Sequence, residues 1–389
     1  MNNSSSALTS SDIEETIAWR HHLHSIPELA FEEHATAAFV AERLTSFGYS
    51  VTTGVGRTGV VATLSRGTSR KSIGLRADFD AIPGTEESGV SYASRSPGKM
   101  HGCGHDGHTA MLLGAAKSLA TTDGIDGTVH FIFQPAEEVE GGGQAMVEDG
   151  LFQRFPVDAV FAIHNWPALA LNSVSATPGP VMAAFGIFDI EIRGRGAHGG
   201  MPHEGADPNV AAFHIGSALQ SVVSRNASPL SSGVISITTV NGGNAYNVIP
   251  ESCRLTGTTR WLEPSVGDLI DSRLREIAVG VGNALGCDVA VTYQRRYPVT
   301  MNDPKETEFV QAALRRIEPP IALVTNALPS MGAEDFAFML NEVPGAYLWL
   351  GAEREGNNPP LHSPHYDFND QIVGTGVNIW RELVLSKLG

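Results

Sequence analysis

Eight residues, His101-Gly-Cys-Gly-His-Asp-Gly-His108, hold the densest group of metal-binding side-chain types in the chain. They supply one thiol, one carboxylate and three imidazoles, from Cys103, Asp106, His101, His105 and His108. Thiolates, imidazoles and carboxylates are the groups that bind divalent transition metals. Glycines allow the backbone to turn tightly enough to direct neighbouring side chains to one point. A polar turn before a helix, with one buried cysteine, is the simpler interpretation, but the density of ligand types favours a metal site.

Acidic or imidazole side chains follow three apolar runs that we interpret as strands. Residues 72–76 lead to Asp78 and Asp80, residues 127–133 lead to Glu137 and Glu138, and residues 157–163 lead to His164. Open α/β sheets place their sites at the carboxyl ends of strands. A turn with an Asx cap would explain the first run alone, whereas packing does not explain the repetition. The three runs therefore predict a functional site at these strand ends.

The Glu137-Glu138 pair could divide two tasks between two carboxylates. Adjacent side chains on a strand end or turn point in different directions. One of them can therefore bind metal while the other faces a metal-bound water. A general base must reach that water without being a ligand itself. A surface acidic pair is the usual role of two adjacent glutamates, but here the pair follows an apolar strand and a proline.

Three further residues are candidates for substrate contact. His198 lies among glycines at the end of a strand and could polarise a substrate carbonyl. Asn247 and Arg260 could bind a substrate carboxylate, for which arginine offers a bidentate fork. Taken singly, each of the three is more often structural. His21 and His24 share a helix face with an apolar residue, which favours packing or a solvated surface over metal binding.

Composition and charge narrow the class of protein. The chain has 389 residues, of which 42% are hydrophobic and 17% charged, which fits a globular protein of two domains. A net charge of -16 argues against nucleic acid or an anionic membrane as partner. Three cysteines do not make a disulfide framework. The N-terminus lacks a signal-peptide pattern, and no apolar run reaches the roughly 18 residues of a membrane span. We expect a soluble, cytoplasmic protein.

The hydrophobic pattern changes near residue 183, which predicts a second domain. Residues 183–297 read as strand, helix, strand, strand, helix, strand, and apolar and polar residues alternate in the strands 186–193 and 253–260. This order is typical of a ferredoxin-like α+β domain with its helices on one face of an antiparallel sheet. We interpret it as an insertion into an α/β domain formed by residues 1–182 and 298–389.

Seven motifs, in this order along the chain, resemble those of the hippurate hydrolase-type amidohydrolases. They are Cys103-Gly-His-Asp-Gly-His, Gln134-Pro-Ala-Glu-Glu, His164-Asn, Ala197-His-Gly-Gly, Asn247-Val-Ile-Pro, Gly332-Ala-Glu-Asp-Phe and Leu361-His-Ser-Pro. This family is similar to the plant indole-acetyl amino acid hydrolases and belongs to the aminoacylase and carboxypeptidase superfamily. The resemblance covers nearly the whole chain, from about residue 20 to about residue 370, and the motifs are specific only in combination.

The resemblance implies a two-metal, exopeptidase-like catalytic domain with a mixed central sheet flanked by helices. It also implies an inserted lid domain through which such proteins often form homodimers or dimers of dimers. The residues that match metal ligands are Cys103, His105, Glu138, His164 and His362. In the family pattern, the residue that matches Cys103 bridges the two ions. Glu137 matches the general base, and Asp78 matches an aspartate that orients the ligands. His198, Asn247 and Arg260 match lid residues that contact the substrate or the oxyanion.

The implied cofactor is one or two divalent ions of zinc, manganese, cobalt or nickel. The wider superfamily has a ligand histidine two residues before the matched aspartate, where this chain has Arg76. The thiolate and imidazole groups around Cys103 take its place in the hippurate hydrolase branch.

The implied reaction is metal-assisted hydrolysis of the amide bond of an N-acyl amino acid, with an aromatic or aliphatic acyl group. Glu137 would take a proton from water and return it to the leaving amine, while His198 would help to stabilise the oxyanion. An N-acetyl-diaminopimelate-type deacetylase, a dipeptidase or carboxypeptidase, and a metal-binding protein without catalysis are the alternatives. The Pro-Cys-x-x-Cys signature of zinc deaminases is absent from the sequence.

Overall fold

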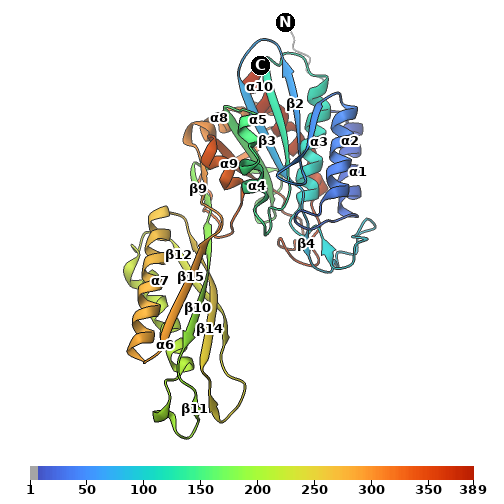
Figure 1. Cartoon of the computed structure of the whole chain (residues 1–389). Coiled ribbons are helices and arrows are strands. Elements are labelled where there is room, and N and C mark those ends of the chain that lie inside the picture. The colour runs from blue at the N-terminus through green and yellow to red at the C-terminus, as the bar shows by residue number, and fades with distance from the viewer. Residues whose placement is uncertain (1–7) are drawn as a thin grey trace. The chain divides into compact units, whose positions relative to one another are not determined.

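The computed structural model describes residues 8–389 and divides them into two compact units (Figure 1). The first unit contains the described chain up to Val181, together with Met301–Leu328 and Asp335–Gly389. The second contains Met182–Thr300 and Pro329–Glu334. The short segment Pro329–Glu334 joins the second unit because the N–H of Ala183 donates to the carbonyls of Ser330 and Gly332. The expected division put this segment in the first domain.

A mixed sheet of eight strands forms the centre of the first unit, which confirms the expected α/β class. Its order is β1 (Ser50–Val55), β2 (Gly59–Arg66), β6 (Gly127–Gln134), β3 (Ser72–Asp78), β7 (Ala159–Trp166), β18 (Gly345–Gly351), β8 (Ser173–Ser175) and β17 (Ala322–Val324). The four central strands β6, β3, β7 and β18 are parallel to their neighbours among these four. Every residue of β3 and β18 is buried, as expected for parallel strands covered on both faces.

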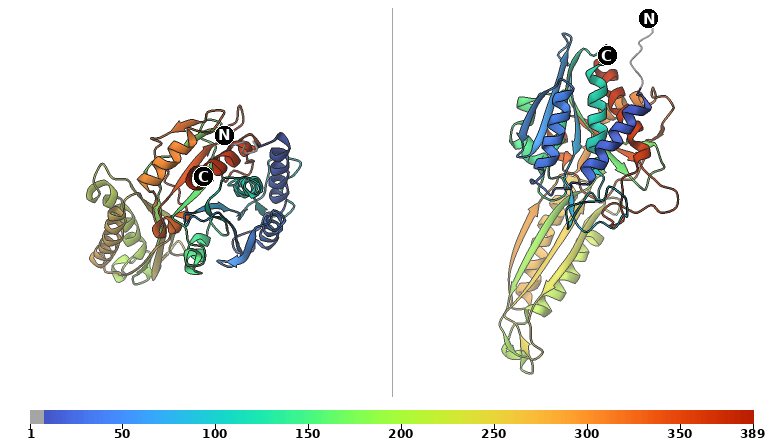
Figure 2. Two further views of the ribbon diagram at one scale, coloured as in Figure 1. Left: turned by 90° about the horizontal axis from the view of Figure 1, so that it is seen from above. Right: turned by 90° about the vertical axis from the view of Figure 1, so that its right-hand side faces the viewer.

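Helices of the first unit pack against this sheet. They are α1 (Ser10–His24), α2 (His34–Ser46), α3 (His105–Ala120), α4 (Gly142–Glu148), α5 (Leu151–Arg154), α8 (Pro304–Leu314), α9 (Phe336–Glu342) and α10 (Val373–Leu388). The helices α3 and α10 pack side by side (Figure 2). Apolar residues of α2, α3, α8 and α10 share one hydrophobic core with the sheet. None of the helices within residues 8–389 combines the length and the apolar character that a membrane crossing requires.

The helix α3 begins four residues earlier than the sequence pattern predicts. We expected it to span residues 109–120, but it starts at His105. Gly104 adopts a positive φ of 97° at the N-cap, where a Cβ atom would lie 2.3 Å from Oδ1 of Asn165. Glycine is therefore required at this position, and it places His105 and His108 on the first turn of the helix.

The second unit has the predicted order of strands and helices. It consists of β10 (Ala184–Arg193), α6 (Pro208–Ser221), β12 (Gly233–Asn241), β14 (Ser252–Trp261), α7 (Pro264–Ala284) and β15 (Asp288–Arg295). The sheet order is β12-β14-β10-β15 with antiparallel neighbours, and α6 packs against α7. A separate hydrophobic core joins these helices to the sheet. A separate two-stranded sheet pairs β11 (Ala197–His198) with β13 (Val248–Ile249).

Candidate metal centre

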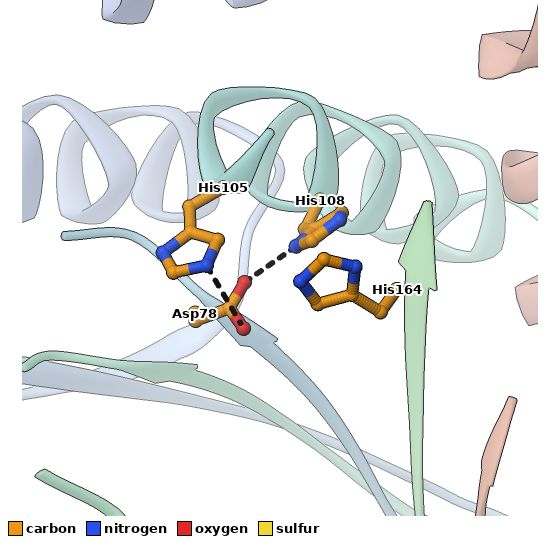
Figure 3. A group of neighbouring side chains, drawn as sticks. All are labelled: Asp78, His105, His108 and His164. Atoms are coloured by element: carbon orange, nitrogen blue, oxygen red, sulfur yellow. Dashed lines mark hydrogen bonds and ion pairs between the residues drawn. The ribbon is translucent and has the colours of Figure 1, made fainter. Parts of the chain in front are cut away.

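The carboxyl ends of three neighbouring strands bring the predicted side chains to one edge of the first unit's sheet. Because β3 is parallel to both β6 and β7, the three strands end on the same side. Asp78 is the last residue of β3, and His164 lies within β7, which extends to Trp166 rather than ending at residue 163. The first turn of α3 meets this edge, so that Asp78, His105, His108 and His164 converge (Figure 3).

The five residues expected to be metal ligands lie together at this edge. Ligand atoms of Cys103, His105 and Glu138 lie within 4.8 Å of one another. Nε2 of His164 is 3.4 Å from the sulfur of Cys103. Nε2 of His362 is 3.2 Å from Oε1 of Glu138. The set therefore joins residues from four separate stretches of the chain.

One of these ligand atoms, Nε2 of His105, is buried without a hydrogen-bond partner. It lies 3.9 Å from Oε1 of Glu138. That separation is too long for a hydrogen bond, but two ligand atoms bound to one ion at about 2.1 Å could be this far apart. Buried polar atoms without partners are rare and call for an explanation. A thiol, imidazoles and a carboxylate in this arrangement fit a divalent transition metal.

The local charges also fit a cation. Burial, followed by the carboxylates of Glu138 and Glu137, raises the pKa of Cys103 well above its ordinary value. Burial alone would lower the pKa of His105, but the surrounding carboxylates, with that of Asp78 first, raise it to about 10. Burial, with the neighbouring His108, lowers the pKa of His164, as suits a neutral imidazole ligand. The site thus concentrates negative charge that a bound cation would offset.

Asp80 is a supporting residue to which the sequence analysis gave no role. Nδ1 of His105 lies 3.0 Å from the carbonyl oxygen of Asp80 and 3.1 Å from its Oδ1. Oδ2 of Asp80 accepts the N–H of Glu138 at 3.0 Å. A proton held on Nδ1 leaves Nε2 of His105 available as a ligand atom. Asp80 therefore orients two of the candidate ligands. The resemblance implied such a task for Asp78, and that role stays a prediction.

Asp78 lies between a buried arginine and two histidines, with its Oδ2 3.8 Å from Nε2 of His105. Its Oδ2 accepts from Arg76 at 2.7 Å, and its Oδ1 is 2.6 Å from Nδ1 of His108. Burial opposes ionisation of Asp78, but Arg76, His105 and His108 bring its pKa well below the ordinary value. Nε2 of His108 is 2.6 Å from Oδ1 of Asn165. Both ring nitrogens of His108 are thus engaged, which favours a supporting role over metal binding.

Arg76 connects this edge to a motif near the end of the chain. Its side chain is 1% exposed, and it also donates to Oε1 of Gln134 at 2.8 Å and to Oδ1 of Asp335 at 3.1 Å. Asp335 in turn accepts from Gln134 and from the N–H of Gly143. A fixed guanidinium charge therefore holds together the ends of β3 and β6 and the starts of α4 and α9.

The turn that carries Glu137 is held in place by the carboxylate of Glu33. Glu137 is 7% exposed and follows Ala136, whose φ of 54° lies in the left-handed region. The N–H of Ala136 donates to Oε1 of Glu33 at 2.9 Å, and Thr58 donates to Oε2 of Glu33 at 2.6 Å. Burial, followed by the charge of Asp80, raises the pKa of Glu33 to about 7. The turn conformation is thus fixed by a side chain more than 100 residues away in sequence.

His362 reaches the site from a loop that has an unusual backbone conformation. Its φ is 67°, and its N–H donates to the carbonyl of Gly102 at 2.7 Å. A positive φ in a non-glycine residue costs free energy and often marks a functional position. The hydrogen bond ties this loop directly to the stretch that contains Cys103.

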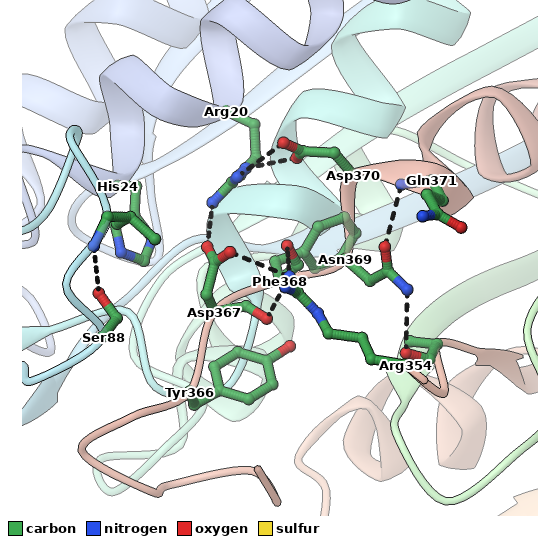
Figure 4. Close-up of polar contacts among 12 residues, drawn as sticks. Arg20, His24, Ser88, Arg354, Tyr366, Asp367, Phe368, Asn369, Asp370 and Gln371 are labelled. Carbon is green, nitrogen blue, oxygen red and sulfur yellow. Dashed lines mark hydrogen bonds and ion pairs between the residues drawn. The ribbon is translucent and has the colours of Figure 1, made fainter. Parts of the chain in front are cut away.

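Helix α1 braces both sides of the site, and its histidines pack and form ion pairs outside the ligand group, as expected (Figure 4). His24 is fully buried, packs edge-on against the ring of Tyr92 and contacts Asp106 at 2.8 Å and Glu86 at 3.1 Å. Arg20 pairs with Asp367 and Asp370 at 2.9 Å and with Asp106 at 3.5 Å. The helix thereby links the residue after His105 to the loop that follows His362.

The three predicted substrate-contact residues all lie in the second unit. His198 and Asn247 are exposed at the β11–β13 strand pair, where the N–H of Gly199 donates to the carbonyl of Asn247. Arg260 lies near the other end of β14, with its guanidinium over the ring of Phe185. The unit therefore brings His198 close to Asn247 but not to Arg260, and their roles stay a prediction.

Comparison with known proteins agrees with this geometry. Residues 74–386 match Peptidase family M20/M25/M40. The chain is 39% identical to a hippurate hydrolase of Campylobacter jejuni over 95% of both sequences. It is 36% identical to an N-acetyl-L-cysteine deacetylase of Bacillus subtilis, over 92% of this chain and 84% of the relative. A Bacillus subtilis protein described as a dinuclear metal binding peptidase superposes with a TM-score of 0.86 at 30% identity, over 98% of this chain and 99% of that structure. The chain belongs to peptidase family M20/M25/M40.

Proposed function

We propose that the protein is a metal-dependent amidohydrolase that cleaves hippurate-like N-acyl amino acids to a carboxylic acid and a free amino acid. The observation that carries the proposal is the group of Cys103, His105 and Glu138, of which Cys103 and His105 are buried, with the buried Glu137 next to Glu138 in sequence. A relative named hippurate hydrolase, at 39% identity over nearly the whole chain, supports the substrate class.

The chain's own residues divide the work of hydrolysis. Cys103, His105, Glu138, His164 and His362 would hold one or two divalent ions of zinc, manganese, cobalt or nickel. Bound there, such ions would polarise the amide carbonyl and lower the pKa of water. Glu137 accepts the proton of the attacking water and passes it to the leaving nitrogen. Asp80 keeps His105 and Glu138 oriented while this happens.

Substrate contacts from the second unit complete the proposal. Arg260 is assigned to the substrate carboxylate, for which a guanidinium offers two parallel donors. His198 and Asn247 are assigned to the polarised carbonyl oxygen and the groups around it. What supports these assignments is the match of each residue to its family motif.

The test is release of free amino acid from a panel of N-benzoyl and N-acetyl amino acids. Metal-free protein is compared with protein refilled with zinc, manganese, cobalt or nickel. We expect metal-dependent release that ranks the acyl groups. Faster cleavage of the N-acetyl compounds would favour a deacetylase, the alternative that the Bacillus subtilis relative supports. No release with any metal, from protein that binds metal tightly, would favour a metal-binding protein without catalysis.

We also propose a homodimer formed through the second unit. Strand β12 is at the edge of its sheet, and the adjacent helix α6 exposes Val210 by 42% and Phe213 by 66%. An unpaired strand edge beside exposed apolar side chains suits pairing with a second copy. Light scattering should give twice the chain mass for the wild type and for Val279→Glu on α7, but a monomer for Phe213→Glu. A wild-type monomer at all concentrations would contradict the proposal.

A reducing, cytoplasmic setting fits the cysteines. All three, Cys103, Cys253 and Cys287, are free and buried. Cys103 can bind metal only while it stays reduced, because oxidised sulfur is no longer a thiolate ligand. Cell fractionation tests this placement, and recovery of the protein outside the cytoplasm would contradict it.

A further inference from the structure

An apolar cavity lies beside the candidate metal centre, within the first unit. Its volume is about 320 Å³, and it is lined by Trp166, Pro167, Ala168, Asn358, Pro360 and Leu361. Asn358 is the polar member, and its Nδ2 donates to the carbonyl of Pro167 at 2.8 Å. That hydrogen bond joins the two loops that form the walls. The lining contains no charged side chain.

Both walls continue directly from candidate metal ligands. Trp166 follows His164 by two residues on β7, so both side chains point to the same side of the sheet. Their ring centroids are 6.2 Å apart. On the other wall, Leu361 immediately precedes His362. A group in this cavity would therefore lie next to the place where the amide bond is cleaved.

The cavity is already formed, because its residues are held in place. The ring of Trp166 stacks on that of Trp349 with centroids 4.3 Å apart and planes 12° apart. Trp349 lies on the central strand β18 and is 5% exposed. Pro167 and Pro360 have restricted backbone angles. Ordering these walls would therefore cost little free energy when a ligand binds.

We propose that this cavity binds the acyl group of the substrate and favours flat, aromatic acyl groups such as benzoyl. The inference rests on the proposed function, since it divides an N-acyl amino acid between two places. The amino acid half carries a carboxylate, which a lining without a cationic side chain does not attract. The acyl half is apolar, and an aromatic ring can pack against the exposed part of Trp166. The volume is at the lower end of the range for small-molecule pockets, which suits one ring.

The experiment compares N-benzoylglycine with N-acetylglycine as substrates of the metal-loaded full chain. The quantity measured is the ratio of their kcat/KM values, since the amino acid half is the same in both. Trp166→Ala removes one wall, and Ala168→Phe fills the cavity from an exposed position that should tolerate the change. The matched control is Leu171→Ala, an apolar truncation nearby that does not line the cavity.

We expect the wild type to favour the benzoyl substrate. Each of Trp166→Ala and Ala168→Phe should lower the benzoyl-to-acetyl ratio at least tenfold, chiefly through a higher KM for the benzoyl substrate. Leu171→Ala should leave the ratio within twofold of the wild type. An unchanged ratio in both cavity variants, with both substrates still cleaved, would overturn the acyl-site inference while leaving the amidohydrolase proposal intact. Failure of the wild type to cleave either substrate with any of the four metals would overturn both.

Discussion

At the scale of single residues, the site depends on side chains that are not themselves ligands. Asp80 holds Nδ1 of His105 and the N–H of Glu138, and so sets the direction of two candidate ligand atoms. Such supporting carboxylates raise ligand basicity and fix the imidazole tautomer. The oriented ligands, rather than their mere proximity, would give the site its affinity for metal.

Asp80→Asn should therefore weaken metal binding by about 10- to 100-fold, because an amide can no longer supply two anionic acceptors. Competition with a chromogenic chelator measures the change. Asp126→Asn is the control, since Asp126 binds backbone N–H groups of Thr68 and Ser69 in a loop beyond the amino-terminal end of β6. Equal metal affinity in Asp80→Asn and the wild type would show that Asp80 has no such role.

The candidate metal ligands could be predicted from the sequence, but the residues that orient and brace them could not. Cys103, His105 and Glu138 were recognisable because unusual side chains stood at short spacing or after an apolar strand. Asp80 followed the same strand, and its position two residues after Asp78 was the available signal. The ion pairs of His24 with Asp106 and of Arg20 with Asp367 could not be predicted, because the partners are far apart in sequence.

At the scale of elements, α1 acts as a brace between α3 and the loop that carries His362. Arg20 is completely buried and contacts three carboxylates, of which Asp106 is also buried. Removing one partner of a buried ion pair leaves an uncompensated charge. The stability of the site thus depends on a helix that contributes no ligand.

Arg20→Met should lower the free energy of unfolding of the first unit by about 3–5 kcal/mol. It should also increase metal loss during dialysis, because the loop that carries His362 is no longer tied to α3. Urea unfolding and metal analysis measure the two effects. Arg154→Met removes an exposed pair with Asp149 and should change stability by less than about 1 kcal/mol. Similar losses in the two variants would argue against the brace.

The turn after β6 should make stability depend on pH through Glu33. The pKa of Glu33 is about 7 in the folded protein against 4.5 as the ordinary value. The native state therefore keeps a proton that the unfolded chain releases, and this contribution to stability falls as the pH rises from about 4.5 to 7. In the Glu33→Gln variant the side chain cannot ionise, so the variant does not lose this contribution to stability. From pH 5 to pH 8, its unfolding free energy should gain about 2 kcal/mol relative to the wild type. A constant difference would contradict the raised pKa.

At the scale of the whole molecule, the two units could be predicted because their strands have different patterns. The strands of the first unit's sheet centre are continuous apolar runs, whereas β10 alternates between buried and less buried residues. The order of strands across the eight-stranded sheet could not be predicted, since it depends on pairings between distant segments such as β8 and β17. The assignment of Pro329–Glu334 to the second unit likewise rests on backbone hydrogen bonds that leave no sequence pattern.

The proposed division between metal ligands and general base is tested by comparing metal content and turnover in the wild type and in Glu137→Gln. Both proteins are stripped of metal, reloaded and assayed for amino acid release from N-benzoylglycine. We expect equal metal per chain in the two proteins and a kcat about 10²- to 10⁴-fold lower in Glu137→Gln, because the variant binds metal but lacks the general base. Wild-type turnover in Glu137→Gln, or undiminished turnover in stripped wild-type protein, would contradict this division.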